Sequence, residues 1–217
     1  MRPCECTSDP KICDDCSCSP CVCPPKVRLK IKLSDGRIRA IKHIKTDMFY
    51  GNNGKPIAVA EFLENMFGQL PKFFKSESEL KAKWANPLTR KQLLTELDTA
   101  GYGEEILRSV QQLIAAEDCD LLDVLEYIAY SVEPIERAKR VDERRDAIFE
   151  GLTKEQHEFV EFITNKYILT GVSELALDKL PTLIQMKYGT AGDAVRAFGT
   201  PALIKQTFTG FQQSLYR

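Results

Sequence analysis

Residues 121–130 read Leu-Leu-Asp-Val-Leu-Glu-Tyr-Ile-Ala-Tyr, and apolar side chains cover most of the circumference of the helix they would form. A helix at a protein surface is apolar along one stripe, so a helix that is apolar on most sides belongs inside a fold. We therefore predict that residues 121–130 form the central helix of a helical bundle.

The segments on both sides of this helix carry the apolar spacing and the end signals of further helices. Four of them begin at a polar capping residue, and one begins with the capping box Thr153-Lys-Glu-Gln156. The other three capping residues are Asn86 before Pro87, Thr190, and Thr200 before Pro201. The pattern predicts a mainly α fold, a helical bundle of about eight helices with a small N-terminal β-hairpin and a Cys-rich tail.

Residues 26–40 have the period of two strands instead of a helix. Apolar and basic residues alternate from Lys26 to Leu33, as expected for a strand with one buried face. Ser34-Asp35-Gly36 is a turn signal, and Ile38 and Ala40 resume the alternation. This predicts a β-hairpin, with room for a third short strand in 44–50.

Length and composition limit the class of protein. The chain has 217 residues, 43% hydrophobic residues and a formal net charge of -1, which fits one globular domain or two small ones. The charge balance does not indicate a general nucleic-acid coat. No apolar run approaches the ~18 to 20 residues that span a bilayer, and residues 1–23 lack the apolar region of a secretory signal. We expect a cytoplasmic protein without a membrane segment.

Changes in composition divide the chain into zones. Residues 1–25 predict a Cys-rich tail or linker, 26–55 a basic β-hairpin, and 56–217 a helical domain. The helical domain can consist of two lobes, 56–133 and 152–217. Residues 134–147 are charged nearly throughout, so we expect a solvated helix that bridges the lobes.

Seven of the eight cysteines lie in the first 23 residues. Structural zinc needs four thiolate or imidazole ligands, and Cys-x2-Cys spacing supplies two from one turn. One interpretation is therefore that the tail binds one or two zinc ions, and the other is a reduced, flexible linker without metal. We expect no required cofactor in the helical domain. The candidate ligands are Cys13, Cys16, Cys18 and Cys21, with Cys4, Cys6 and Cys23 as further thiols.

The hairpin is strongly basic, because eight Lys and Arg face one acid within residues 26–45. Evenly spaced cations on a strand can bind phosphates without reading sequence. The alternative is that a solvated strand face must be polar, and that Lys at a sheet edge prevents aggregation. The candidate nucleic-acid-binding residues are Arg28, Lys30, Lys32, Arg37 and Arg39.

Signals for catalysis are weak. His43 and His157 lie far apart in sequence, and neither stands in a nucleophile motif. The segment 51–56 is too short between its glycines for a phosphate loop and is interpreted as a turn. Glu79-Leu80-Lys81 matches part of a magnesium-nuclease signature, but three-residue matches of this kind arise by chance in so charged a chain. We predict no catalytic residue.

The order of several segments resembles one family. The hairpin is followed by Ala60-Glu-Phe-Leu-Glu-Asn-Met-Phe-Gly-Gln-Leu-Pro71, Leu152-Thr-Lys-Glu-Gln-His-Glu-Phe159, Gly171-Val-Ser-Glu-Leu175, Lys179-Leu-Pro-Thr-Leu183, Lys187-Tyr-Gly189, Asp193-Ala194 and Phe208-Thr-Gly-Phe-Gln-Gln-Ser-Leu-Tyr216. This looks like the C-terminal helical domain of the restriction (R) subunit of type I restriction-modification enzymes, of the EcoEI kind. The resemblance covers about nine tenths of the chain.

The resemblance implies a non-catalytic assembly module that docks the motor and nuclease part of the R subunit to a methyltransferase core of M and S subunits. The family's nuclease and motor motifs have no counterpart in this sequence, so we expect neither ATP hydrolysis nor DNA cleavage by this chain, and we expect it to be a fragment or a separated module. The alternative is a sequence-nonspecific DNA-binding domain that uses the basic hairpin. A zinc or redox enzyme is the least favoured class.

The last helix is the candidate partner surface. Phe208, Phe211 and Leu215 stand at spacings of three and four and so line one helical face, which the methyltransferase could cover. Leu203 and Ile204, one turn earlier, can anchor the same helix to the bundle, and the alternative is that all five side chains belong to the core of the domain.

Overall fold

The structure is a computed structural model and describes residues 28–42, 49–50 and 56–217. This part of the chain contains eleven α-helices and two strand pairs, which confirms the predicted mainly α class and the N-terminal hairpin. The strands are β1 (Arg28–Lys32), β2 (Ile38–Lys42), β3 (Phe49–Tyr50) and β4 (Pro56–Ile57). The α-helices are α1 (Val59–Gln69), α2 (Glu77–Ala85), α3 (Pro87–Thr99), α4 (Glu104–Leu113), α5 (Leu121–Tyr130), α6 (Arg137–Glu143), α7 (Arg145–Phe149), α8 (Lys154–Thr170), α9 (Leu180–Tyr188), α10 (Ala191–Phe198) and α11 (Pro201–Leu215). Three short 3-10 turns are η1 (Leu70–Lys72), η2 (Val172–Leu175) and η3 (Leu177–Lys179).

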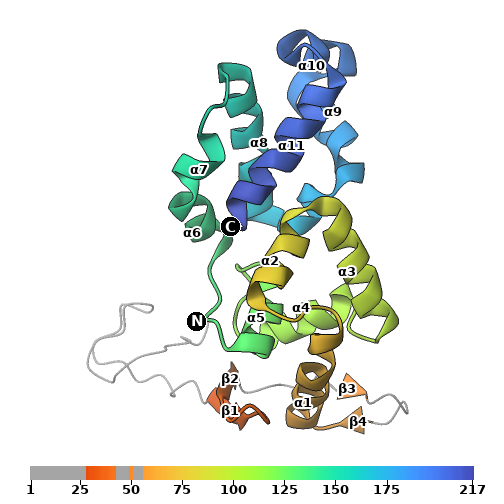
Figure 1. Ribbon diagram of the computed structural model, residues 1–217, viewed down its shortest axis with the longest axis vertical. Helices are drawn as coiled ribbons and strands as arrows, with labels where there is room; N and C mark the ends of the chain where they lie inside the picture. The colour runs from red at the N-terminus through yellow and green to blue at the C-terminus, as the bar shows by residue number, and fades with distance from the viewer. Residues whose placement is uncertain (1–27, 43–48, 51–55) are drawn as a thin grey trace, which may run out of the picture.

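Figure 1 shows the hairpin and α1 at one end of the longest axis and α10 at the other. Helices α2 to α5 lie next to the hairpin, and α8 to α11 lie beyond them. The buried apolar residues form one cluster that reaches from Ile31 in the hairpin to Tyr216 near the end of the chain. None of the helices in the described ranges is long and apolar enough to cross a membrane.

The central position predicted for residues 121–130 is confirmed. All eight residues from Leu121 to Ile128 are buried, including Asp123 and Glu126. Helix α5 contacts α1, α2 and α4. Because its two acidic residues share this burial, the surrounding helices must supply them with polar partners.

The predicted helix starts are also confirmed. The Asn86 side chain accepts a hydrogen bond from the amide of Leu88, and Pro87 follows at the first helical position. The side chain of Thr153 accepts from the amide of Gln156, whose side chain accepts in turn from the Thr153 amide. These contacts satisfy backbone donors that a helix leaves free at its start, and they depend only on neighbours in sequence.

The inner face of β2 differs from the expected one. Ile31 pairs with Arg39, and both are buried, whereas Ile38 is 55% exposed. Residues opposite each other on paired strands share a face. Because the strand register places Arg39 opposite the buried Ile31, the arginine side chain lies on the core side of the hairpin. The inner residues of β2 are therefore Arg39 and Ile41, and the expectation for Ile38 and Ala40 is wrong.

The charged segment 134–147 is not simply a solvated bridge. It forms α6 and the start of α7, and Arg140 and Val141 of α6 are buried against the rest of the fold. The Arg140 Nη2 donates to Asp123 Oδ1 of α5 at 2.6 Å. One of its charges thus pairs with a buried acid of the central helix.

Candidate functional site

The predicted zinc ligands Cys13, Cys16, Cys18 and Cys21, with Cys4, Cys6 and Cys23, lie outside the residues that the structure describes. Within the described ranges Cys119 is a buried free cysteine, and burial raises the pKa of its thiol to about 12. The thiolate is the form that binds metals and attacks electrophiles, so Cys119 is suited to neither role. No group of three or more His, Cys, Asp or Glu that could hold a metal occurs in this part of the chain.

The outer face of the hairpin carries part of the predicted phosphate-binding set. Alternate residues of a strand share a face, so Lys30 and Lys32 occupy the face opposite the buried Ile31, whereas the side chain of Arg28 lies outside the part of the chain that the structure describes. Lys30 and Lys32 are exposed to solvent. An exposed strip of this kind can attract phosphates by charge.

Arg37 and Arg39 instead hold the hairpin to the end of the central helix. Arg39 is fully buried and donates to the carbonyl oxygens of Tyr127 and Ile128 at 2.8 and 2.7 Å. Arg37 Nη1 donates to the carbonyl oxygen of Tyr130 at 2.6 Å. The last carbonyls of a helix lack partners within it and carry its negative dipole end, which explains why two cations are used there. Phosphate binding by Arg39 is therefore contradicted, because its guanidinium is inaccessible.

The predicted partner face of the last helix is also contradicted. Phe208, Phe211 and Leu215 of α11 are at most 3% exposed. Their face of α11 is covered within the molecule, since α11 contacts α2, α7, α8 and α10. Helical spacing identified the buried face correctly but not which helices bury it. Phe208, Phe211 and Leu215 belong to the apolar core with Ile204, and Leu203 packs against this core while partly buried.

A buried polar cluster joins the first half of the fold to the last. The hydroxyls of Tyr167 on α8 and Tyr216 at the end of α11 donate to Asp120 Oδ2 at 2.9 and 2.5 Å. Burial, followed by the negative charge of Asp120, raises the pKa of both tyrosines, so both keep the protons that they donate. The Arg140 guanidinium lies 5.6 Å from the centre of the Tyr216 ring and ties α6 to the same cluster.

Arg90 makes a second connection between the halves. This side chain of α3 is 3% exposed and donates to three acceptors: the carbonyl oxygens of Trp84 and Leu175, at 2.9 and 2.8 Å, and Gln212 Oε1, at 2.8 Å. Gln212 donates in turn to the carbonyl oxygen of Phe208 in α11. The arrangement fixes the positions of α3, η2 and α11 relative to one another.

Sequence reasoning did not identify these two connections. Asp123 and Glu126 within an otherwise apolar helix signal buried polar contacts, since buried acids require partners, but neither residue belongs to these two connections. The partners themselves were not recoverable, because Arg90 and Gln212 are 122 residues apart in sequence and Asp120 and Tyr216 are 96 apart.

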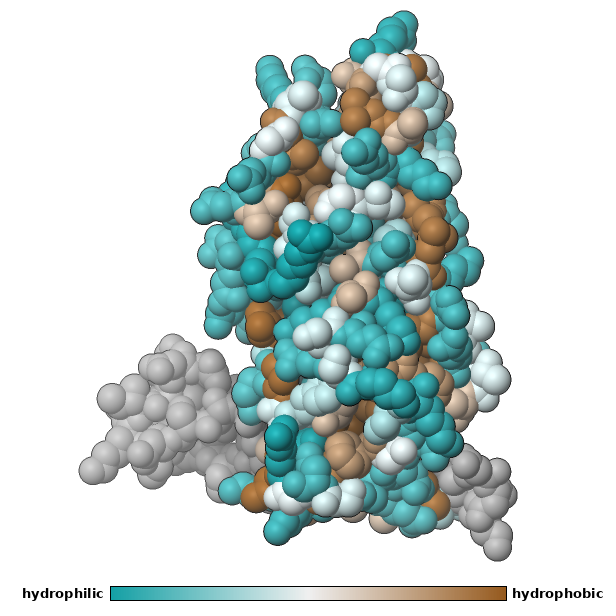
Figure 2. All heavy atoms as spheres, viewed as in Figure 1, coloured by the Kyte–Doolittle hydropathy of each residue, from teal (hydrophilic) through white to brown (hydrophobic). Residues whose placement is uncertain are grey.

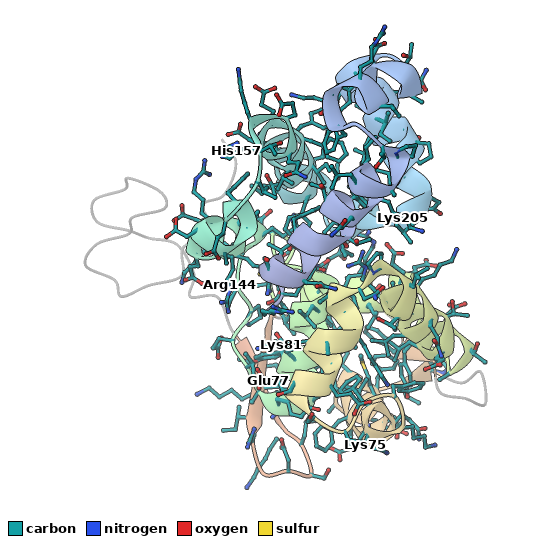
Figure 3. All side chains as sticks on the ribbon, turned by 45° about the horizontal axis from the view of Figure 1, so that its top comes forward. Lys75, Glu77, Lys81, Arg144, His157 and Lys205 are labelled. Carbon is teal, nitrogen blue, oxygen red and sulfur yellow. The ribbon has the colours of Figure 1, made fainter. Side chains whose placement is uncertain are left out.

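Glu126 of the central helix faces charges on three elements. Lys81 of α2 approaches it at 3.5 Å, Glu77 also lies on α2, Asp123 lies on α5 and Arg140 on α6. Figure 3 labels Lys81 and Glu77 on α2. Burial is the largest influence and raises the pKa of Glu126 from 4.5 to about 7, although Lys81 acts in the opposite direction.

We expect replacement of Glu126 by Gln to stabilise the protein at high pH only. Between pH 4.5 and 7 the folded state keeps a proton on Glu126 that the unfolded state has lost, so this group makes the wild type less stable as pH rises through that window. At pH 8 Glu126→Gln should gain about 2–3 kcal/mol over the wild type, and at pH 4.5 the gain should vanish.

Urea denaturation at pH 4.5, 6 and 8 would measure this difference. Glu133→Gln is the matched control, because Glu133 follows the same helix but is exposed and should show no pH-dependent gain. A constant difference between Glu126→Gln and the wild type at all three pH values would contradict the expected titration.

Comparison with known proteins gives one match. The family described as EcoEI R protein C-terminal matches residues 60–216, which begin in α1 and end beside the last helix. Neither the search of curated proteins nor the search of solved structures found a match to the chain.

Proposed function

Because the chain belongs to the EcoEI R protein C-terminal family, the C-terminal part of type I restriction enzyme R subunits, we propose that it is a non-catalytic assembly module in DNA restriction. In this role it docks the motor and nuclease part of the R subunit to the methyltransferase core formed by M and S subunits. The observation that carries the proposal is the family match over nearly the whole helical part of the chain.

The internal connections of the fold support this role. A module between a moving motor and a fixed methyltransferase has to keep its own shape under load. Asp120 with its two tyrosines, and Arg90 with its three acceptors, tie together helices that are distant in sequence. Closely packed interiors whose polar groups are joined by hydrogen bonds resist such deformation.

Direct binding tests the proposal. The full chain, titrated with purified methyltransferase core from the same genome, should bind with a Kd that changes less than about tenfold between 0.1 and 0.5 M salt, because contacts through apolar surface are weakly screened. A methyltransferase core from an unrelated type I system serves as the control. Absence of binding to the core at micromolar concentrations would contradict the docking role.

DNA binding by the hairpin is the second candidate function. The observation that favours it is the exposure of Lys30 and Lys32 on one strand face, and the burial of Arg39 weakens it. A DNA duplex without methyltransferase, titrated in the same salt series, distinguishes the two functions. Phosphate binding should weaken steeply as salt rises, since each neutralised phosphate releases a counterion.

A further inference from the structure

A groove between α9, α10 and the start of α11 is lined mainly by apolar side chains. Its volume is about 710 Å³. In Figure 2 hydrophobic surface follows the right-hand side of the molecule at the height of η3 and α9 in Figure 1. The apolar residues that line the groove are Leu177, Leu180, Pro181, Ile184, Val195 and Ile204.

The apolar surface extends past the groove. Leu177 also borders a second hollow of about 720 Å³ between α3 and the turns η2 and η3. Leu88 of α3 lines this hollow and is 62% exposed. Adjoining apolar hollows that share the half-buried Leu177, with the exposed Leu88 in the second, are typical of a surface that a partner covers.

The groove carries a positive charge. Lys205 of α11 is the charged residue among those that line it, and it is exposed. Figure 3 labels Lys205 on α11, beside α9. No ion pair within the described ranges includes it. A partner seated in the groove would therefore complement it with an acidic side chain.

The walls of the groove also restrict the backbone of the occupant. They are helices, a 3-10 turn and the turn between α9 and α10, whose backbone groups pair internally except at the helix ends, and no open strand edge lies among the lining residues. An extended peptide in this groove would leave its own backbone groups without partners. An α-helix satisfies its backbone internally and can insert an apolar ridge.

We propose that this groove binds an amphipathic α-helix of the methyltransferase core, with apolar residues against Leu180 and Ile184 and an acidic residue against Lys205. The proposal rests on the docking function and assigns it to a surface on α9, α10 and α11. It replaces the buried face of α11 as the partner-binding surface of the domain.

Two variants of the full chain test the groove against purified methyltransferase core. Ile184→Glu places a charge among the apolar contacts, and Lys205→Glu reverses the complementary charge. Each should raise the Kd at least tenfold. Leu169→Glu and Lys154→Glu are the matched controls, because both residues are exposed and line neither the groove nor the second hollow, and these variants should bind within about twofold of the wild type.

The outcomes separate the groove from the docking function. If the wild type binds the core and both groove variants bind equally well, the groove assignment is wrong while the docking role stands. If the wild type does not bind, the docking role itself fails and the groove assignment fails with it. Circular dichroism melting checks folding, and Lys205→Glu decides the result if Ile184→Glu unfolds, since an exposed lysine has no packing to lose.

The nature of the occupant needs its own measurement. A photo-crosslinking residue in place of Gln185, which also lines the groove, should attach to one methyltransferase peptide with apolar residues three and four positions apart and a nearby Asp or Glu. A crosslink to a segment without that pattern would overturn the helix assignment. A dimer of the chain alone that Ile184→Glu abolishes would show a second copy in the groove and overturn it as well.

Discussion

Replacement of Arg90 by Met should cost about 3–5 kcal/mol of unfolding free energy, one of the two largest effects we expect in this protein. Met matches the length of the arginine stem but removes all three hydrogen bonds to Trp84, Leu175 and Gln212. Their oxygens would stay buried without donors, and a buried unsatisfied acceptor costs about 1–3 kcal/mol. Loss of the buried cation offsets part of this cost, because burial also lowers the pKa of Arg90.

Urea denaturation followed by circular dichroism would measure the loss. Lys91→Met changes the neighbouring residue of the same helix, which is exposed, and should stay within about 0.5 kcal/mol of the wild type. A stability loss for Arg90→Met no larger than that of Lys91→Met would show that the three contacts do not hold α3, η2 and α11 together.

Phe208→Ala should destabilise the fold by a similar amount, about 3–5 kcal/mol, because it removes a fully buried ring and leaves a cavity. The ring also packs edge to face against Phe211 at 6.1 Å between centroids, which adds to the loss. The loss of stability is expected because Phe208 lies in the core. An exposed partner contact would instead keep the stability and lose binding.

The comparison variant is Gln213→Ala on the same helix, where the side chain is exposed and should contribute little. Thermal melting of both variants and titration with the methyltransferase core separate the two roles. A Phe208→Ala protein that keeps wild-type stability but loses binding would restore the partner role of this face and contradict its burial.

Part of the candidate site was predictable and part was not. Basic residues in the hairpin were evident, and Lys30 and Lys32 lie on the solvent side as expected. Arg39 is also basic and also alternates with apolar residues, yet it is buried at the end of α5. The spacing of charges along a strand says nothing about which face a neighbouring helix will cover.

The sequence by itself determined the local structure: the starts of the helices at Asn86, Thr153, Thr190 and Thr200, the central place of residues 121–130, and the hairpin. These features depend on contacts within about four residues or on the hydrophobicity of one segment. The tertiary structure alone decided which partners meet across the fold. The pairing of Ile31 with Arg39 turned an arginine inward, and the packing of α11 on four other helices buried its aromatic face. Contacts between residues about a hundred positions apart exist only after the chain has folded, so no local pattern encodes them.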